Sequence, residues 1–464
     1  MKNETYFDNA LPVFASVIEQ RWGAGALESN VFLRDVTGRL SFVVLDEKYN
    51  LDDRRKLGEE VFGLLGNYVD DAEFAVTTPE ELFDDSLKSL ESSRKAKISW
   101  GSFKGEIHIV DRRMVGADWL RVPAVESSPP KRISFASIKG GVGRSTALCV
   151  VAAHLASKGR RVLAIDMDIE APGLGNMLLP ADTLPPFGLL DYLVERNLGE
   201  LDDEFYVDMV GASWLGGGRG RVDVIPAIGQ RSLENPENVL AKIARAYLPG
   251  QVNGTSESSS FLDHINVLVG RFADPHRYDV ILIDSRAGLH ETTAAAVVGL
   301  GAEVLFFGID QPQTFAGYEL LLAHLGTLPV LEEDDWRDRL YFVQAKAPVE
   351  APRRNQFAIT MAGLFAKYLW PVSTETIEPL DVSVLSDTFE LEWEDEAVVE
   401  EPLSDSVAEP LVLAVLDDDR YHSFDPLTDR DTLAQSLYEK TFGEIIKRVE
   451  QVMEIERSRN DGGN

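Results

Sequence analysis

The chain has 464 residues, enough for two or three domains that each bury a core. Hydrophobic residues make up 44% and charged residues 26% of the sequence, which is ordinary for a globular protein. Against 45 Lys and Arg stand 77 Asp and Glu, and the net charge of −32 disfavours non-specific DNA binding and anionic membranes. The sequence shows neither an apolar run of roughly 18 to 20 residues nor a secretory leader, so we expect a cytoplasmic protein. The single cysteine, Cys149, excludes an internal disulfide and is expected to be a buried structural thiol.

Residues 1–125 are expected to form a small α+β domain of undefined role. The runs VFLRDV, LSFVVLDE and GEIHIVD have the composition of strands, and residues 53–69 carry apolar side chains at helical spacing. Thr78, Pro79 and Glu81 have the order of a capping box and predict the start of a second helix. We find no catalytic constellation in this region.

Residues 126–131 are polar and proline-rich and are expected to link this domain to the next. From residue 132 to 370, buried β-branched strands alternate with helical stretches such as 145–158 and 317–328. This alternation predicts a doubly wound α/β domain with a mostly parallel sheet covered on both faces. The predicted strands are ISFASI, RRVLAIDMD, RVDVIPA, YDVILID, AEVLFFGID and LYFVQAK.

Residues 371–430 are expected to be an acidic, partly ordered extension. The stretch 371–419 contains sixteen Asp or Glu and no Lys or Arg, but hydrophobic residues are scattered through it. It is either a solvated insert, a site for a basic partner, or a shield for the protein's own loop. Residues 431–464 are expected to form a C-terminal helix and tail, whose apolar stripe docks on the domain or a partner.

The stretch KGGVGRSTAL, residues 139–148, follows the first strand of the α/β domain. Gly140, Gly141 and Gly143 allow successive backbone N–H groups to point at phosphate oxygens, and the following helix adds its positive end. Ser145 stands where Mg²⁺ takes a hydroxyl ligand, and Thr146 is placed to reach the α-phosphate.

Acidic motifs follow two later strands. Asp166 and Asp168 come directly after one strand and Asp284 after another, where open α/β sheets place ligand-binding residues. Converging carboxylates beside a phosphate loop are explained by a need to hold Mg²⁺ and a nucleophilic water.

These segments resemble the MinD/ParA class of P-loop ATPases. KGGVG, residues 139–143, resembles its deviant Walker A loop, and IDMDIEAPGLGNMLL, residues 165–179, resembles its second conserved region. IDSRAGLHETT, residues 283–293, resembles its Walker B and switch II. The resemblance covers about residues 131–345, and the KGGVGR loop identifies a variant branch of the class.

The resemblance implies a role for each matching residue. Lys139 would reach across a dimer interface to the partner's phosphates, and Asp168 would orient the attacking water. Asp166 and Asp284, with Ser145, would hold Mg²⁺. Gly288 would sense the γ-phosphate through its N–H, and Gln344 is either the base-recognising amide or a plain strand-end residue. The expected nucleotide-binding set is Lys139, Gly140, Gly141, Val142, Gly143, Arg144, Ser145, Thr146, Gly288 and Gln344.

Two arginines lie within these motifs, Arg144 in the glycine loop and Arg286 in the switch segment. Arg144 stands where a P-loop ordinarily has its lysine, so we expect binding to be retained and hydrolysis, in which Arg144 is counted as catalytic, to be weakened. Arg286, inside the switch segment, contacts phosphate from the same chain or forms a surface salt bridge.

Two functions follow. The first is a slow ATPase that works as a switch: Mg-ATP closes a homodimer, and the nucleotide state is signalled to an unidentified protein partner, with bacterial defence as a plausible setting. The second is a nucleotide-binding scaffold that barely hydrolyses, because Arg144 replaces the lysine. The sequence leaves ATP versus another nucleotide open. Iron–sulfur relatives are excluded because one cysteine cannot ligate a cluster.

Overall fold

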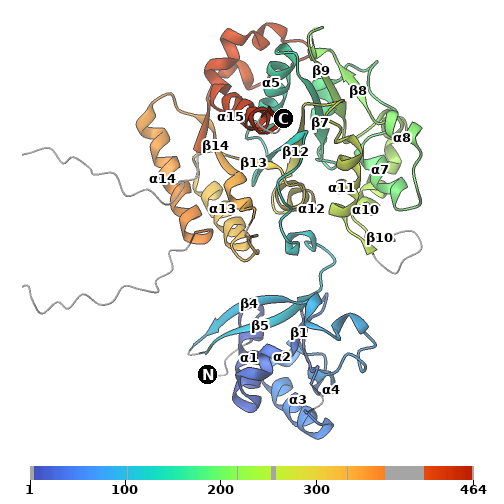
Figure 1. Ribbon diagram of the computed structural model, residues 1–464, viewed down its shortest axis with the longest axis vertical. Coiled ribbons are helices and arrows are strands. Elements are labelled where there is room, and N and C mark those ends of the chain that lie inside the picture. Colours follow the sequence, from blue (N-terminus) through green and yellow to red (C-terminus); the bar gives the residue numbers. More distant parts are fainter. Residues whose placement is uncertain are drawn as a thin grey trace, which may run out of the picture. The chain divides into compact units, whose positions relative to one another are not determined.

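The computed structural model describes residues 5–46, 48–101, 103–216, 218–251, 258–331, 333–370 and 412–461. The chain divides into two compact units, Met1–Ala117 and Asp118–Asn464 (Figure 1). Most of the predicted acidic extension, residues 371–411, lies outside the described residues. None of the described helices combines the length and apolarity needed to cross a membrane.

The first unit is a five-stranded mixed sheet with helices. Its strand order is β3-β2-β1-β5-β4, in which β1 pairs antiparallel with β2 and parallel with β5. Phe14, Phe32 and Phe42 form its aromatic centre, with ring centroids 4.8 to 6.4 Å apart. The elements are α1 (Phe7–Trp22), α2 (Ala24–Ser29), β1 (Val31–Arg34), β2 (Leu40–Val43), α3 (Leu51–Leu65), α4 (Ala72–Ala75), β3 (Val76–Thr77), β4 (Arg94–Trp100) and β5 (Phe103–Asp111).

The prediction of a helix that begins at Thr78 is wrong, because no α-helix begins there in the structure. The capping-box contacts do form, because the Thr78 N–H donates to Glu81 Oε2 at 3.0 Å and the Glu81 N–H to Thr78 Oγ1 at 3.4 Å. The chain nevertheless turns away after one turn, because Phe83 takes a left-handed φ of 53°. Glu81 also pairs with the buried Arg54 at 2.6 Å, and this pairing ties the turn to α3.

The second unit is built on one eight-stranded sheet with the order β15-β14-β13-β6-β12-β7-β9-β8. All neighbouring pairs are parallel except β8 with β9. This confirms the doubly wound α/β fold and all six predicted strands. The strands of this sheet are β6 (Lys131–Ser137), β7 (Arg161–Asp166), β8 (Gly211–Ser213), β9 (Arg221–Ile225), β12 (Val280–Ala287), β13 (Glu303–Gly308), β14 (Leu340–Ala347) and β15 (Val412–Leu416).

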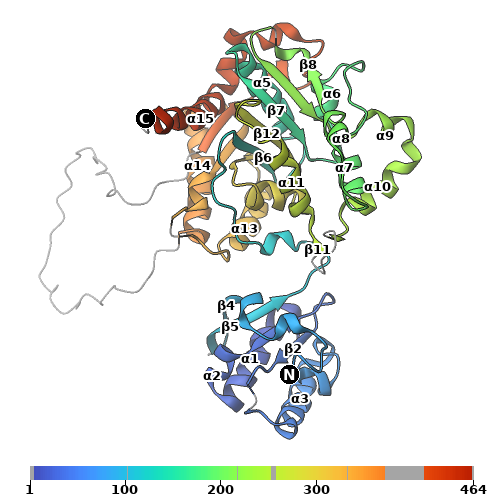
Figure 2. The ribbon, with the colours of Figure 1, turned by 45° about the vertical axis from the view of Figure 1, so that its right-hand side comes forward.

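Helices cover both faces of this sheet (Figure 2). One face packs on α5 and α15, and the opposite face packs on α7, α11, α13 and α14. A short antiparallel pair, β10 (Gly250–Gln251) with β11 (Ser258–Ser259), lies outside the sheet. The helices are α5 (Arg144–Ser157), α6 (Leu174–Leu178), α7 (Leu189–Arg196), α8 (Asp203–Val207), α9 (Gln230–Glu234), α10 (Val239–Ala246), α11 (Phe261–Phe272), α12 (Glu291–Ala294), α13 (Pro312–Leu325), α14 (Ala351–Tyr368) and α15 (Gln435–Asp461).

The stretch before β6 packs on this second unit. Trp119 is buried, and the carboxylate of Asp118 accepts the N–H of Leu262 in the first turn of α11 at 2.8 Å. The N–H of Ser127, within the predicted linker 126–131, donates to Gly301 O at 2.8 Å. These contacts place the start of the second unit at residue 118, ahead of the predicted boundary at 125.

The C-terminal end belongs to the α/β unit. Strand β15 extends the sheet beside β14, and α15 lies across it against α5. The helix therefore docks on its own domain, and its stripe of Phe442, Ile445 and Val449 is buried there. Arg448 anchors it through an ion pair with Glu303 at the start of β13, at 2.5 Å.

We expect Ile445→Ala to lower the free energy of unfolding of the second unit by about 2–5 kcal/mol, because it leaves a cavity between α15 and the sheet. The matched control is Lys447→Ala, an exposed position on the same helix, which should change it by less than about 0.5 kcal/mol. Urea denaturation followed by circular dichroism measures both. Equal stability of the two variants would contradict the packing of α15 into the core.

Candidate functional site

The loop from β6 to α5 has the backbone shape of a phosphate cradle. Gly141 and Gly143 take left-handed φ angles of 74° and 83°, which residues with a side chain rarely adopt. Gly143 caps α5, and its carbonyl accepts the N–H of Ala147 at 2.9 Å. The base of the loop is fixed by the Ser137 hydroxyl, which donates to Lys139 O at 2.7 Å. The positive end of α5 therefore faces the loop.

Two carboxylates lie side by side at the carboxyl ends of β7 and β12. Asp166 and Asp284 are register partners on these strands, and both are almost completely buried. Burial and the neighbouring charge of Asp284 raise the pKa of Asp166 to about 7. Burial also raises the pKa of Asp284, although Arg144 and the Ser145 hydroxyl act in the opposite direction. The sheet thus brings like charges together directly beneath the loop.

The two carboxylates have different partners. Both oxygens of Asp166 accept backbone N–H groups, those of Asp168, Gly173 and Leu174, at 3.0 to 3.2 Å. Asp166 therefore anchors the loop that follows β7. Asp284 Oδ2 accepts the Ser145 hydroxyl at 2.5 Å, but its buried Oδ1 has no hydrogen-bond partner among the described residues.

Ser145 and Asp284 have the chemistry of a magnesium site. An oxygen pair of this kind, one carboxylate and one hydroxyl beside a phosphate cradle, suits an ion that takes its remaining ligands from phosphates and water. Within the described ranges, no group of three or more His, Cys, Asp or Glu residues is arranged to hold a metal by itself. The residues fit Mg²⁺ held jointly with a nucleotide. Asp166, also predicted as a ligand, has its oxygens engaged with the backbone.

Arg144 and Asp168 face each other across the site. Arg144 Nη2 lies 4.0 Å from Asp168 Oδ2, and both side chains are largely buried. The N–H of Ala171 donates to Asp168 Oδ1 at 3.1 Å. Burial raises the pKa of Asp168, while the charges of Arg144 and Arg286 lower it. The loop arginine is therefore engaged with the carboxylate predicted to orient water.

Two further predicted residues are engaged within the chain. The Lys139 ammonium donates to Gln313 Oε1 in the first turn of α13. Gly288 has a φ of 95°, and its N–H donates to Ser137 O at 2.9 Å. The N–H of Gly288, predicted to sense the γ-phosphate, can reach a phosphate only if this hydrogen bond breaks.

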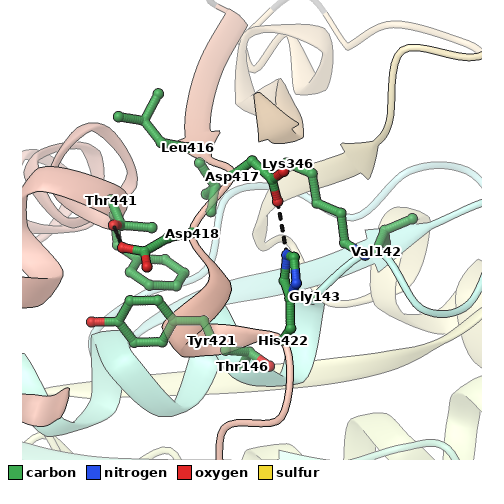
Figure 3. A pocket seen from close by; sticks show the side chains of 12 residues that line it. Val142, Gly143, Thr146, Lys346, Leu416, Asp417, Asp418, Tyr421, His422 and Thr441 are labelled. Carbon is green, nitrogen blue, oxygen red and sulfur yellow. Dashed lines mark hydrogen bonds and ion pairs between the residues drawn. The ribbon is translucent and has the colours of Figure 1, made fainter. Parts of the chain in front are cut away.

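A pocket of about 270 Å³ opens beside the loop and receives residues that the sequence did not single out. Lys346 comes from the end of β14, and Tyr421 and His422 come from the turn after β15 (Figure 3). His422 Nε2 lies 2.8 Å from Asp417 Oδ1. The pocket residues are Gly141, Val142, Gly143, Arg144, Ser145, Thr146, Lys346, Tyr421 and His422.

Gln344, the predicted base-recognising amide, does not line this pocket. It lies two residues before Lys346 on β14, where it is almost completely buried. Its Nε2 has no hydrogen-bond partner among the residues that the structure describes. The missed residues had one sequence signal, an aromatic and a histidine after the hydrophobic run LVLAVL, but only the sheet pairing brings them to the loop.

The family of CobQ/CobB/MinD/ParA nucleotide binding domains matches residues 133–309. No curated protein matches the chain. A plasmid partition protein of Borrelia burgdorferi B31 bound to AMPPNP is 17% identical, with 69% of this chain and 99% of that chain covered and a TM-score of 0.38. The MinD cell division protein of Aquifex aeolicus is 15% identical, with 70% of this chain and 96% of that chain covered and a TM-score of 0.40. A ParA family ATPase of Chlorobium tepidum TLS is 15% identical, with 68% of this chain and 98% of that chain covered and a TM-score of 0.39. The family match covers the part of the second unit that carries the glycine loop and the paired carboxylates, and residues 133–309 thus resemble a CobQ/CobB/MinD/ParA nucleotide binding domain.

Proposed function

We propose that the protein is a Mg-ATP-dependent switch ATPase that dimerises around its nucleotide and signals its state to a protein partner. The observation that carries this proposal is the contact between Ser145 and Asp284 directly below the glycine loop. It places a hydroxyl, a carboxylate with an unpartnered oxygen and the positive end of α5 at one point. A nucleoside triphosphate with its metal satisfies all three groups.

In this proposal the chain's residues divide the work. The N–H groups of Gly140, Gly141 and Gly143 and the cation of Arg144 bind the phosphates, and Thr146 contacts the α-phosphate. Ser145 and Asp284 hold Mg²⁺, which screens the phosphate charge when bound. Asp166 fixes the loop on which Asp168 orients the attacking water.

The base lies in the pocket formed by Lys346, Tyr421 and His422, with the Gln344 amide below it. The Tyr421 ring, packed on Phe442, forms an apolar wall of this pocket, and the His422 imidazole, paired with Asp417, offers a polar edge. Adenine is the base we propose, in line with the ATPases that share this domain family.

Dimerisation requires Lys139 to exchange partners. In the single chain its ammonium is held by Gln313, an uncharged group. A phosphate of a nucleotide bound in a second copy is a stronger acceptor for an ammonium than an amide oxygen is. The nucleotide thus favours the dimer, the state that a partner protein reads. Bacterial defence is the setting we propose.

A second function, a scaffold that binds nucleotide and barely hydrolyses it, is favoured by one observation. Arg144 Nη2 lies 4.0 Å from Asp168 Oδ2, so that the cation of the loop lies beside the carboxylate proposed to orient water. Arginine is bulkier than lysine and always charged, which makes this pairing persistent.

The switch predicts nucleotide-dependent dimerisation. We expect Asp168→Asn, which keeps an oxygen for the Ala171 N–H, to form dimers with ATP, because it binds but does not hydrolyse. Adding Lys139→Ala should abolish these dimers, whereas Lys158→Ala, an exposed lysine after α5, should leave them intact. Size-exclusion chromatography with light scattering measures the mass. Monomers under all nucleotide conditions would refute the switch.

The two functions are separated by Arg144→Lys. We expect turnover to rise about tenfold, equivalent to about 1.4 kcal/mol of barrier, because the more flexible lysine releases Asp168. Steady-state phosphate release measures turnover, and the Kd for ATP should stay within about threefold, or roughly 0.7 kcal/mol. Unchanged or lower turnover would mean that arginine already serves as the catalytic cation.

A further inference from the structure

The loop that follows β7 is joined to the end of β12 by an ion pair between Glu170 and Arg286. Arg286 Nη1 lies 2.5 Å from Glu170 Oε1, and both side chains are about 30% exposed, at 27% and 30%. His290 Nε2 approaches the same Glu170 oxygen at 3.8 Å. The Tyr247 ring packs edge-on against His290, with centroids 4.8 Å apart. Arg286 is thus held at the rim of the site by one carboxylate.

The base of the Arg286 side chain is fixed. Its carbonyl accepts the hydroxyl of the buried Thr293 at 2.9 Å. Two residues later, Gly288 is tied to Ser137 at the foot of the glycine loop. The guanidinium can therefore change partners through its own side chain torsions, without moving the strand that carries it.

Arg286 also lies close to the phosphate end of the site. It stands at the carboxyl end of β12, two residues after Asp284, and its partner Glu170 stands two residues after Asp168. Two arginine–carboxylate pairs, Arg144 with Asp168 and Arg286 with Glu170, therefore share the loop that follows β7. The Nη1 atom of Arg144 is buried and has no hydrogen-bond acceptor among the described residues. Two arginines thus face carboxylates of the same loop, and Arg144 has a donor to spare.

We propose that Arg286 contacts the terminal phosphate of the bound nucleoside triphosphate, and that Glu170 holds its guanidinium in reserve until that phosphate arrives. This inference rests on the proposed nucleotide site and adds a residue that distinguishes triphosphate from diphosphate. A terminal phosphate carries more negative charge than one carboxylate and accepts two parallel N–H bonds from guanidinium. Because the ion pair with Glu170 is partly exposed, water weakens it, and the phosphate displaces it.

The contact between Arg286 and the terminal phosphate also links the nucleotide to the loop after β7 and to the end of β12. When Arg286 turns to the phosphate, Glu170 loses its main partner and its loop is released from the end of β12. With a diphosphate the pair is kept. The loop after β7 and the end of β12 are therefore joined when a diphosphate is bound and separate when a triphosphate is bound. A switch requires a contact of this kind, with two states.

The test compares the affinities of the full-length protein for a non-hydrolysable ATP analogue and for ADP by calorimetry. We expect Arg286→Gln to weaken analogue binding about tenfold and ADP binding less than about threefold. Glu170→Gln should tighten analogue binding about threefold or more, because Arg286 no longer has to leave a partner, and should leave ADP unchanged. Glu170→Asp should restore the wild-type ratio of affinities.

The double variant Glu170→Gln with Arg286→Gln should behave like Arg286→Gln, since Glu170 acts through the arginine. Glu60→Gln is the control, because Glu60 is exposed to a similar degree, 35% against 30% for Glu170, and pairs with an arginine, Arg21, in the first unit. Wild-type binding with affinity ratios that none of the variants shifts would overturn this proposal and leave the nucleotide site standing. Failure of the wild type to bind either nucleotide would overturn both.

Discussion

Two buried carboxylates on adjacent strands, Asp166 and Asp284, determine what the surrounding residues have to supply. The folded chain holds a proton on this pair more tightly than the unfolded chain does, as the raised pKa of Asp166 to about 7 indicates. The pair is therefore most favourable for stability at low pH, and that contribution is lost as the pH rises through about 7. Three backbone N–H groups and the Ser145 hydroxyl offset part of this cost. A fold that keeps such a pair at neutral pH gains from a cation beside it.

Local sequence patterns predicted the architecture around this pair. The strands of the second unit are short apolar runs bounded by glycine or charge, and parallel strands buried on both faces require that composition. The loop was predictable because a left-handed backbone at Gly141 and Gly143 leaves few residue types to choose from. The positions of Asp166 and Asp284 at strand ends also predicted that they lie close together, because neighbouring parallel strands end at the same edge of the sheet.

What sequence could not give depends on contacts between distant segments. Tyr421 and His422 reach the pocket because β15 pairs with β14 across a long stretch of chain, and no local pattern sets that register. The turn at Thr78 fails to become a helix because Glu81 is captured by Arg54, 27 residues away, while Phe83 turns the backbone. Gln344 is buried on β14 between β13 and β15 and does not line the pocket, since the depth at which a strand residue is buried is decided by the packing of its neighbouring strands.

The approach of Arg144 to Asp168 suggests a physical role for the arginine of the loop. A lysine in place of Arg144 would present a point charge on a flexible stem, whereas guanidinium has five donors in one plane and can serve a carboxylate and a phosphate together. Asp168 can then remain paired while nucleotide binds, and the same carboxylate must be released before it orients water. Binding and hydrolysis therefore draw on one side chain in different states. In the proposed mechanism, arginine in place of lysine would therefore separate nucleotide binding from hydrolysis, while Ser145, Asp166 and Asp284 stay in place.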